Sequence, residues 1–204
     1  MKLQIVGDGA FGTFLKDLLH SYFEIVDNAD SVILAVPISA YEPVAYQNLN
    51  KHLINVCSVQ KPSTDICLRC SNRVTSIHPL FGKRTPPDRR NSILTYSVTG
   101  ENTWAEGLDF HLEFLKIFEK VSKIHTELNG VKFTPESHDL LMSKTHLAAV
   151  IGAKQLKVYT DRVKDVPDEL IPNSFRLMRD FVKTLEDMPQ GTIESIMANP
   201  YFDL

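Results

Sequence analysis

Short apolar segments recur along the first 128 residues, and stretches with helical spacing lie between them. The continuous run at residues 31–37 (SVILAVP) is typical of a strand that is buried on both faces of a sheet. Strands that alternate with helices favour a mostly parallel sheet with helices on both faces. The pattern predicts strands at residues 2–6, 31–37, 53–58, 74–78, 92–98 and 121–126, and helices after residue 10, at 64–70 and at 103–119.

The alternation stops at Asn129-Gly130, a turn signal, and only helical patterns follow. Thr134 and Pro135 are typical of the start of a helix, which we expect over residues 135–159, with further helices at 173–186 and 191–198. We therefore predict a sheet domain at residues 1–128 and a small helical domain at 129–204. So few helical residues enclose little core, so we expect them to pack on the sheet domain, on a second copy, or on both.

The first apolar run leads into Gly7-Asp8-Gly9-Ala10-Phe11-Gly12, a GxGxxG motif that is followed by an amphipathic helix. In dinucleotide-binding folds the first glycine allows a tight turn, the second admits the pyrophosphate, and the third lets the helix pack closely. The N–H groups at the helix N-terminus favour an anion. The motif predicts an α/β fold with a Rossmann-like sheet domain that binds a nucleotide; the alternative is that the glycines serve packing alone.

Asp27 lies about twenty residues after the motif, where an acidic residue often contacts the ribose hydroxyls. It follows residues 23–26 (FEIV), which are separated from the next buried run by only a few residues. Neighbouring parallel strands need a crossover of about a dozen residues, so FEIV cannot pair in parallel with residues 31–37. It is then a short remnant, an antiparallel edge piece, or the sign of a truncated adenosine half. If Asp27 reaches the ribose, its charge favours NAD over NADP.

Composition excludes several classes of function. The 22 Lys and Arg against 25 Asp and Glu give a net charge of −3, which disfavours a nucleic-acid partner. No apolar run approaches the ~20 residues that span a bilayer, and no secretory segment is apparent, so we expect a cytoplasmic protein without membrane contact. Cys67 and Cys70 form a lone CxxC motif on the helix predicted at residues 64–70, for which Ser63 is the predicted N-cap. We expect reduced thiols and no metal site.

Six blocks of the sequence resemble the prephenate/arogenate dehydrogenase family, in the order that the family has them. They are the glycine motif, VILAVPISAYEPV, VCSVQK, SIHPLFG, TPESHD and THLAA, and they span about residues 2–152. The resemblance implies a Rossmann domain and a helical domain through which two subunits form a homodimer. It also implies oxidative decarboxylation of a small dicarboxylate, prephenate or arogenate, in tyrosine biosynthesis, with hydride transfer to NAD or NADP.

The resemblance also implies roles for single residues. His78 matches the catalytic histidine, and a neutral imidazole suits a base that works near pH 7. Ser58 matches a serine beside the reacting hydroxyl and the nicotinamide, and Val36 and Pro37 belong to the cofactor-binding run. The structural alternatives are a histidine that ends a strand before proline and a serine that makes a hydrogen bond at a strand end.

Four residues of the helical region are implied on the substrate side. His138 belongs to the family's His-Asp pair, and His146 follows eight residues later on roughly the same helical face. Arg176 or Arg179 lies where the family places an arginine for a substrate carboxylate, a role for which guanidinium is suited. Surface arginines on an amphipathic helix are the structural alternative.

Departures from the family pattern keep two other functions open. Asn55 stands where Asp is common, Gln60 where Lys is common, Arg84 near a usual acidic position, and Ala149-Val150 where a second histidine is usual. One alternative is a related hydroxyacid or imine reductase with Lys144 as catalytic residue. The other is a shortened family member that binds no cofactor and acts as a dimeric binding or regulatory protein.

Overall fold

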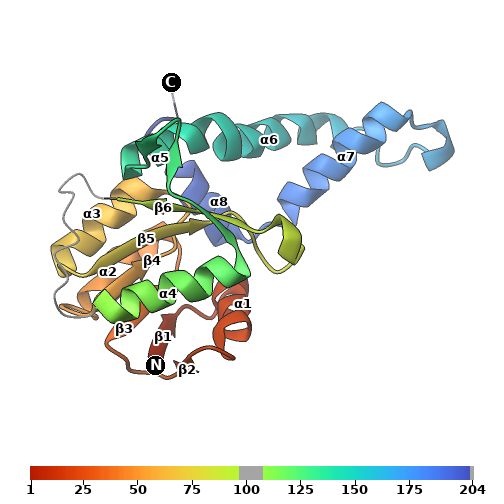
Figure 1. Cartoon of the computed structure of the whole chain (residues 1–204). Coiled ribbons are helices and arrows are strands. Elements are labelled where there is room, and N and C mark those ends of the chain that lie inside the picture. The colour runs from red at the N-terminus through yellow and green to blue at the C-terminus, as the bar shows by residue number, and fades with distance from the viewer. Residues whose placement is uncertain (97–107, 203–204) are drawn as a thin grey trace.

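A seven-stranded sheet forms the first two thirds of the chain in the computed structural model, which describes residues 1–96 and 108–202. The strand order is β2-β1-β3-β4-β5-β6-β7 (Figure 1). Strands β1 to β5 are parallel, β6 is antiparallel to β5, and β7 is parallel to β6. The strands are β1 (Lys2–Val6), β2 (Glu24–Ile25), β3 (Ser31–Leu34), β4 (His52–Asn55), β5 (Val74–Pro79), β6 (Asn91–Thr95) and β7 (Lys123–His125).

The short strand β2 resolves the crossover problem at FEIV. It pairs in parallel with Lys2 and Leu3 of β1, and helix α1 (Ala10–Leu19) supplies the crossover. Strand β3 pairs with the opposite side of β1, so β2 and β3 are not neighbours. The two-residue length confirms the short remnant, and the antiparallel alternative is wrong.

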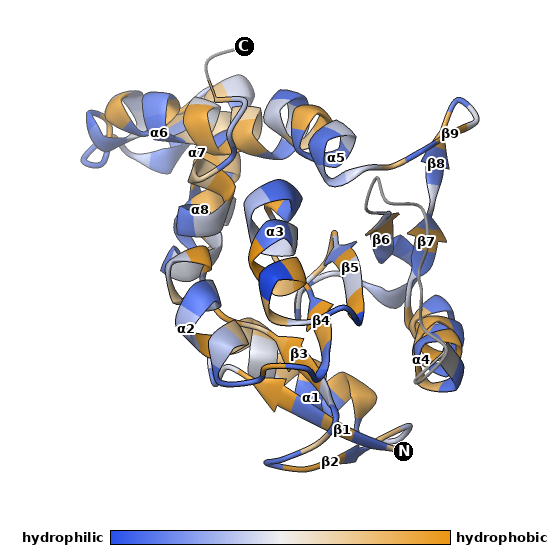
Figure 2. Cartoon of the chain, turned by 90° about the vertical axis from the view of Figure 1, so that its left-hand side faces the viewer, coloured by the Kyte–Doolittle hydropathy of each residue, from blue (hydrophilic) through white to orange (hydrophobic). Residues whose placement is uncertain are grey.

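Alternate side chains of the central strands point into two hydrophobic cores. Ile33 and Ile54 pack with α1 and with α4 (Leu108–Val121) on one face. Val32 and Leu53 face α2 (Tyr41–Tyr46) and α3 (Gln60–Cys70) on the other, beside the short turn η1 (Ile38–Ala40). Figure 2 shows hydrophobic residues gathered along these strands. The sheet is thus buried on both faces, as the apolar run at residues 31–37 predicts.

The helical region continues the chain after a short β8–β9 hairpin. Strands β8 (Glu127–Leu128) and β9 (Val131–Lys132) meet at the predicted turn, where Asn129 and Gly130 have positive φ. Helix α5 (Pro135–Met142) begins at Thr134 with a capping box and continues through a π-helical turn, η3 (Ser143–Leu147), into α6 (Ala148–Asp161). The last elements are η4 (Asp168–Leu170), α7 (Asn173–Glu186) and α8 (Gln190–Met197).

The helical region has two parts, one packed against the sheet domain and one that projects from it (Figure 1). Helices α5 and α8 lie against the sheet domain, with α5 beside α3 and α8 beside η1. Helices α6 and α7 pair with each other and project away from the sheet; we call residues 148–186 the arm. No helix in the described residues is long and apolar enough to cross a membrane.

Several predicted boundaries differ from those observed. The strand predicted at 92–98 ends at Thr95, and residues 97–98 and the start of the helix predicted at 103–119 lie outside the described residues. Helix α3 starts at Gln60, so the prediction of Ser63 as its N-cap is wrong: Ser63 lies inside the helix and its hydroxyl donates to the carbonyl of Val59. The three cysteine thiols are free and buried, and the described residues form no cluster that could hold a metal ion.

Candidate active site

The carboxyl ends of the parallel strands meet at one edge of the sheet, where ligands bind in open α/β folds. Gly7 directly follows β1, Val36 and Pro37 follow β3, Ser58 follows β4, and His78 lies near the end of β5. Because β1, β3, β4 and β5 are consecutive and parallel in the sheet, the topology gathers these sequence-predicted residues on a common edge.

The three motif glycines meet three different surroundings. Gly7 has φ +123°, and a Cβ there would lie 2.2 Å from the carbonyl oxygen of Ala35. A Cβ on Gly12 would lie 2.0 Å from the carbonyl oxygen of Gly7, whereas a Cβ on Gly9 would meet nothing within 4 Å. Gly7 and Gly12 thus permit the turn and the close helix, and Gly9 faces open space at the N-terminus of α1. That space fits the pyrophosphate of a dinucleotide.

A pocket of about 410 Å³ lies beside the glycine turn, along β1 where β2 ends. Its lining includes Gly7, Asp8, Lys16 and Asp27, so the exposed Asp27 carboxylate shares a pocket with the motif. Lys16 Nζ lies 2.7 Å from Asp8 Oδ1, and this contact lowers the pKa of Asp8. The pocket and the free N–H groups of α1 fit a nicotinamide dinucleotide.

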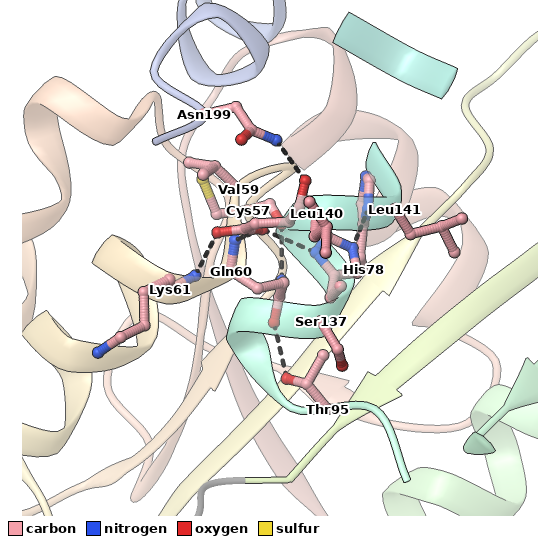
Figure 3. Close-up of polar contacts among 12 residues, drawn as sticks. Cys57, Val59, Gln60, Lys61, His78, Thr95, Ser137, Leu140, Leu141 and Asn199 are labelled. Atoms are coloured by element: carbon pink, nitrogen blue, oxygen red, sulfur yellow. Dashed lines mark hydrogen bonds and ion pairs between the residues drawn. The ribbon is translucent and has the colours of Figure 1, made fainter. Parts of the chain in front are cut away.

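Three histidines from different elements meet at the end of β5, where Figure 3 shows His78. His78 Nδ1 lies 2.9 Å from Nε2 of His138 on α5. The ring of His146, on η3, stacks against that of His78 with centroids 5.9 Å apart. His78 is 2% exposed and His138 is fully buried. Burial first, and then the neighbouring His138 and His146, hold the pKa of His78 well below its usual value, so His78 is neutral near pH 7.

The π-helical turn brings His146 onto the face of His138. Eight residues of a regular α-helix advance about 800°, which leaves the second side chain about 80° from the first. A π-helical turn accommodates about one extra residue, which reduces the offset to about 20°. The sequence predicts one uninterrupted helix over residues 135–159, with His146 on roughly the same face as His138. The π-helical turn at Ser143–Leu147 interrupts this helix and aligns the two histidines more closely than a regular α-helix would.

Asp139 joins the histidines to the sheet domain. Its Oδ1 accepts hydrogen bonds from His138 Nδ1 at 2.8 Å and from the backbone N–H of Gln60 at 2.7 Å. Its Oδ2 accepts from the backbone N–H of Lys61 at 2.8 Å. Asp139 therefore caps α3, whose own N-cap residue, Val59, has no polar side chain. Asn199 donates to the backbone carbonyl of Asp139 at 2.9 Å.

Sequence reasoning missed this cap and the contribution of Asn199. The available signal in the sequence was the His-Asp pair in the first turn of a helix. In the structure both residues of this pair are buried. What Asp139 caps, however, lies 78 and 79 residues earlier in the chain. No local pattern around residue 60 indicates such a partner.

The remaining predicted residues form no hydrogen bond, ion pair or ring contact with the three histidines in the described part of the chain. Ser58 lies half-buried in the loop between β4 and α3. Arg176 donates to the backbone carbonyl of Asp168, and Arg179 forms an ion pair with the Asp168 carboxylate at 2.9 Å, both on the arm. Lys144 is exposed on η3.

The residues that depart from the family pattern have structural roles. Asn55 is fully buried: its amide oxygen accepts from Tyr41 Oη at 2.7 Å, and its amide nitrogen donates to Ser63 Oγ at 2.9 Å. Gln60 is also fully buried and donates to the carbonyl of Cys57. Lys61 forms an ion pair with Asp65 at the surface.

Comparison with known proteins relates this fold to solved structures. No protein-family model matches the chain, and no curated protein matches it significantly. A candidate prephenate dehydrogenase from Corynebacterium glutamicum aligns at 16% identity over 96% of this chain and 73% of its own, with a TM-score of 0.70.

Two further structures give similar results. Synechocystis arogenate dehydrogenase aligns at 16% identity over 98% of this chain and 84% of its own (TM-score 0.62). Prephenate dehydrogenase from Aquifex aeolicus aligns at 14% identity over 96% and 86% (TM-score 0.57). The chain thus shares their fold, a Rossmann-like domain followed by a helical region.

Proposed function

We propose that this chain is an NAD(P)-dependent dehydrogenase that oxidatively decarboxylates prephenate or arogenate. The observation that carries the proposal is the buried, neutral His78, held by His138 at the same sheet edge as the glycine motif. Oxidation of a hydroxyl group requires a proton acceptor, and a neutral imidazole beside a dinucleotide site is suited to that role near pH 7. The shared fold and the six sequence blocks support the same choice.

The proposed reaction gives His78 a defined task. His78 would accept the proton of the ring C4 hydroxyl as C4 is oxidised, and a dinucleotide bound at the glycine motif would supply the hydride acceptor. Loss of the ring carboxylate as carbon dioxide returns the electron pair of the broken C–C bond to the ring, which becomes aromatic. The oxygen at C4 is then a phenolate and recovers the proton from His78. Hydride transfer is the chemistry that the cofactor supplies.

The charges beside the glycine motif favour NAD over NADP. The pocket contains the carboxylates of Asp8 and Asp27 and the ammonium of Lys16, so its net charge is −1. Lys16 is engaged with Asp8. A 2′-phosphate in this pocket would therefore meet an unpaired carboxylate, whereas ribose hydroxyls could donate hydrogen bonds to Asp27.

A homodimer through the helical region is part of the proposal. Arg176 and Arg179 belong to α7, which projects with α6 away from the sheet (Figure 1). A role for either arginine at a substrate carboxylate therefore requires the arm of a second protomer. The exposed apolar side chains of the arm support such an assembly.

A dimeric binding or regulatory protein without cofactor is the second candidate, because β2 pairs with only two residues of β1. Calorimetric titration with NAD and NADP distinguishes the two candidates. Saturable binding favours the enzyme, and no binding at millimolar cofactor favours the second candidate.

The catalytic role of His78 is tested by His78→Asn. The amide can still donate one hydrogen bond to His138, but it cannot accept a proton near pH 7. We expect the rate with prephenate or arogenate to fall by ~10²–10⁴, the usual value of a general base, while NAD affinity changes little. The matched control is His20→Asn, at an exposed histidine that contacts only its own helix and Ser21. Retention of the rate within a few-fold would show that His78 is not the base.

A further inference from the structure

A buried chain of hydrogen bonds runs from the N-terminus of α3 through Asp139 and His138 to His78. We propose that Asp139 and His138 are positioning residues that fix His78 as its Nδ1–H tautomer, so that Nε2 is the atom that accepts the substrate proton. The role of Nε2 rests on the proposed function; the tautomer itself does not. Figure 3 shows how these contacts link α5 with α3 and β5.

The first step is the state of Asp139. Its two oxygens face three donors, namely the N–H groups of Gln60 and Lys61 and His138 Nδ1. An ionised carboxylate is a pure acceptor and satisfies all three. The N-terminus of α3 further stabilises a negative charge at this place. Asp139 is therefore an ionised acceptor that is held in position from the sheet domain.

The second step is the proton on His138. Since Asp139 Oδ1 is an acceptor at 2.8 Å, His138 Nδ1 must carry the hydrogen. A neutral imidazole with its hydrogen on Nδ1 carries its lone pair on Nε2. His78 Nδ1 lies 2.9 Å from that lone pair and must in turn be the donor. The lone pair of His78 is thereby assigned to Nε2.

The third step is the consequence for catalysis. A neutral imidazole without such partners exchanges between two tautomers, and only one presents a base at a given nitrogen. When Nε2 receives a proton, the imidazolium keeps its Nδ1–H bond to His138, and the charge of Asp139 stabilises the cation through His138. The aspartate of a serine-protease triad orients its histidine in the same way. His146, stacked on the His78 ring, restricts the rotation of that ring.

Nuclear magnetic resonance of the ¹⁵N-histidine-labelled full chain at pH 8, without substrate or cofactor, tests the tautomers directly. Long-range ¹H–¹⁵N correlations distinguish protonated from unprotonated ring nitrogens, and His78→Asn and His138→Asn assign the signals. We expect both His78 and His138 as Nδ1–H tautomers. A His78 ring protonated at Nε2, or a doubly protonated His138, would overturn the proposal.

Asp139→Ala tests the catalytic consequence. Loss of the carboxylate leaves His138 Nδ1 without its acceptor, so the tautomers of His138 and His78 are no longer fixed. We expect the His78 signals to become those of two exchanging tautomers and kcat to fall by about tenfold or more with little change in KM. The matched control is Asn199→Ala, which removes the bond to the Asp139 backbone carbonyl and leaves its carboxylate contacts in place. It lowers stability but should preserve the tautomers and the rate within a few-fold.

The possible results separate this proposal from the proposed function. A wild-type rate in Asp139→Ala would overturn the positioning role. The expected tautomers in a wild-type chain that does not oxidise prephenate or arogenate would support the hydrogen-bond chain and contradict the proposed function. The tautomer measurement needs only the folded wild-type protein, so it decides the matter even where Asp139→Ala fails to fold.

Discussion

A fold requires glycine only where it has no room for a side chain. The motif at Gly7, Gly9 and Gly12 contains positions with such room and positions without it. A Cβ on Gly12 would collide with backbone, whereas one on Gly9 would enter open space. The fold therefore requires glycine at position 12 but not at position 9, where a requirement for glycine would come from a bound ligand. The contrast separates the packing interpretation of the motif from the cofactor interpretation.

Gly9→Ala and Gly12→Ala should therefore behave differently. We expect Gly9→Ala to keep the wild-type melting temperature and to weaken dinucleotide binding at least tenfold, because the methyl group occupies the space of the pyrophosphate. Gly12→Ala should lower the melting temperature, since α1 must move away from β1. Thermal unfolding and calorimetric titration measure both effects. Unchanged cofactor affinity in Gly9→Ala would favour glycines that serve packing alone.

A second histidine pair controls the response of the fold to acid. Thr75 Oγ1 lies 2.8 Å from His52 Nε2 and 2.7 Å from His111 Nδ1, inside the sheet domain. Burial, together with the charges of neighbouring His111 and Arg73, lowers the pKa of His52 to about 3, and burial lowers that of His111 to about 4. Both histidines are therefore neutral in the folded chain at pH 5, while in the unfolded chain they are mostly charged.

Stability should consequently fall on acidification. The folded-state pKa of each histidine lies below its unfolded value of about 6.5, so the stabilisation is complete above pH 6.5 and is lost as the pH falls towards 4. Each contributes up to about 1.4 kcal/mol per pH unit in that range. Urea unfolding between pH 7.5 and 4.5 measures the slope, which His111→Gln should reduce by one proton and His20→Gln should not change. A flat profile would contradict the burial of neutral histidines.

Elements defined by local pattern were predicted well from the sequence. The apolar run at 31–37 contains β3, and Asn173–Glu186 matches the predicted helix at both ends, because neighbouring residues determine strand burial and helix periodicity. Elements defined by distant partners were not. Helix α3 begins at Gln60 because Asp139 caps it, and the pairing of β2 with β1 follows from sheet order, which no local pattern contains.

In the candidate site too, the sequence predicts the features that depend on local pattern but not those that depend on distant partners. The glycine turn and the position of His78 at a strand end follow from local sequence and the resemblance. The contact between His78 and His138 depends on how α5 packs on the sheet, and the stacking of His146 depends on a π-helical turn. The sequence predicts His138 and His146 on one helical face and His78 at a strand end, and only the packing joins the three in one cluster.

Helix α8 connects the helical region to the loop after β3, and two glycines test that connection. A Cβ on Gly191 would lie 2.6 Å from Cγ of Pro37, whereas one on Gly152, in α6, would meet nothing within 4 Å. We expect Gly191→Ala to lower the melting temperature and Gly152→Ala to raise stability by about 0.5–1 kcal/mol through helix propensity. Equal effects of the two substitutions, measured by thermal unfolding, would mean that α8 does not pack on Pro37.

The arm carries apolar side chains that are not buried in the hydrophobic cores of the sheet domain. Helices α6 and α7 have 14 residues each, about 21 Å of helix, and pack mainly on each other. Tyr159 and Leu177 are 56% and 63% exposed, and Leu170 at the turn is 73% exposed. Exposed apolar side chains that follow one another along a projecting element are typical of an interaction surface. In the proposed homodimer this surface is covered by a second copy.

Light scattering should therefore give about twice the chain mass of 23.1 kDa at micromolar concentration. Leu177→Glu places a charge on the exposed face of α7, and burying that charge in an interface is costly. We expect this variant to be monomeric and, if the arm supplies the substrate arginine, to have a raised KM for the dicarboxylate. The matched control is Leu68→Glu on α3, where the leucine is also exposed but lies outside the arm; it should remain dimeric. A 23 kDa species for the wild-type chain would contradict the dimer, and with it the assignment of Arg176 or Arg179 to the substrate.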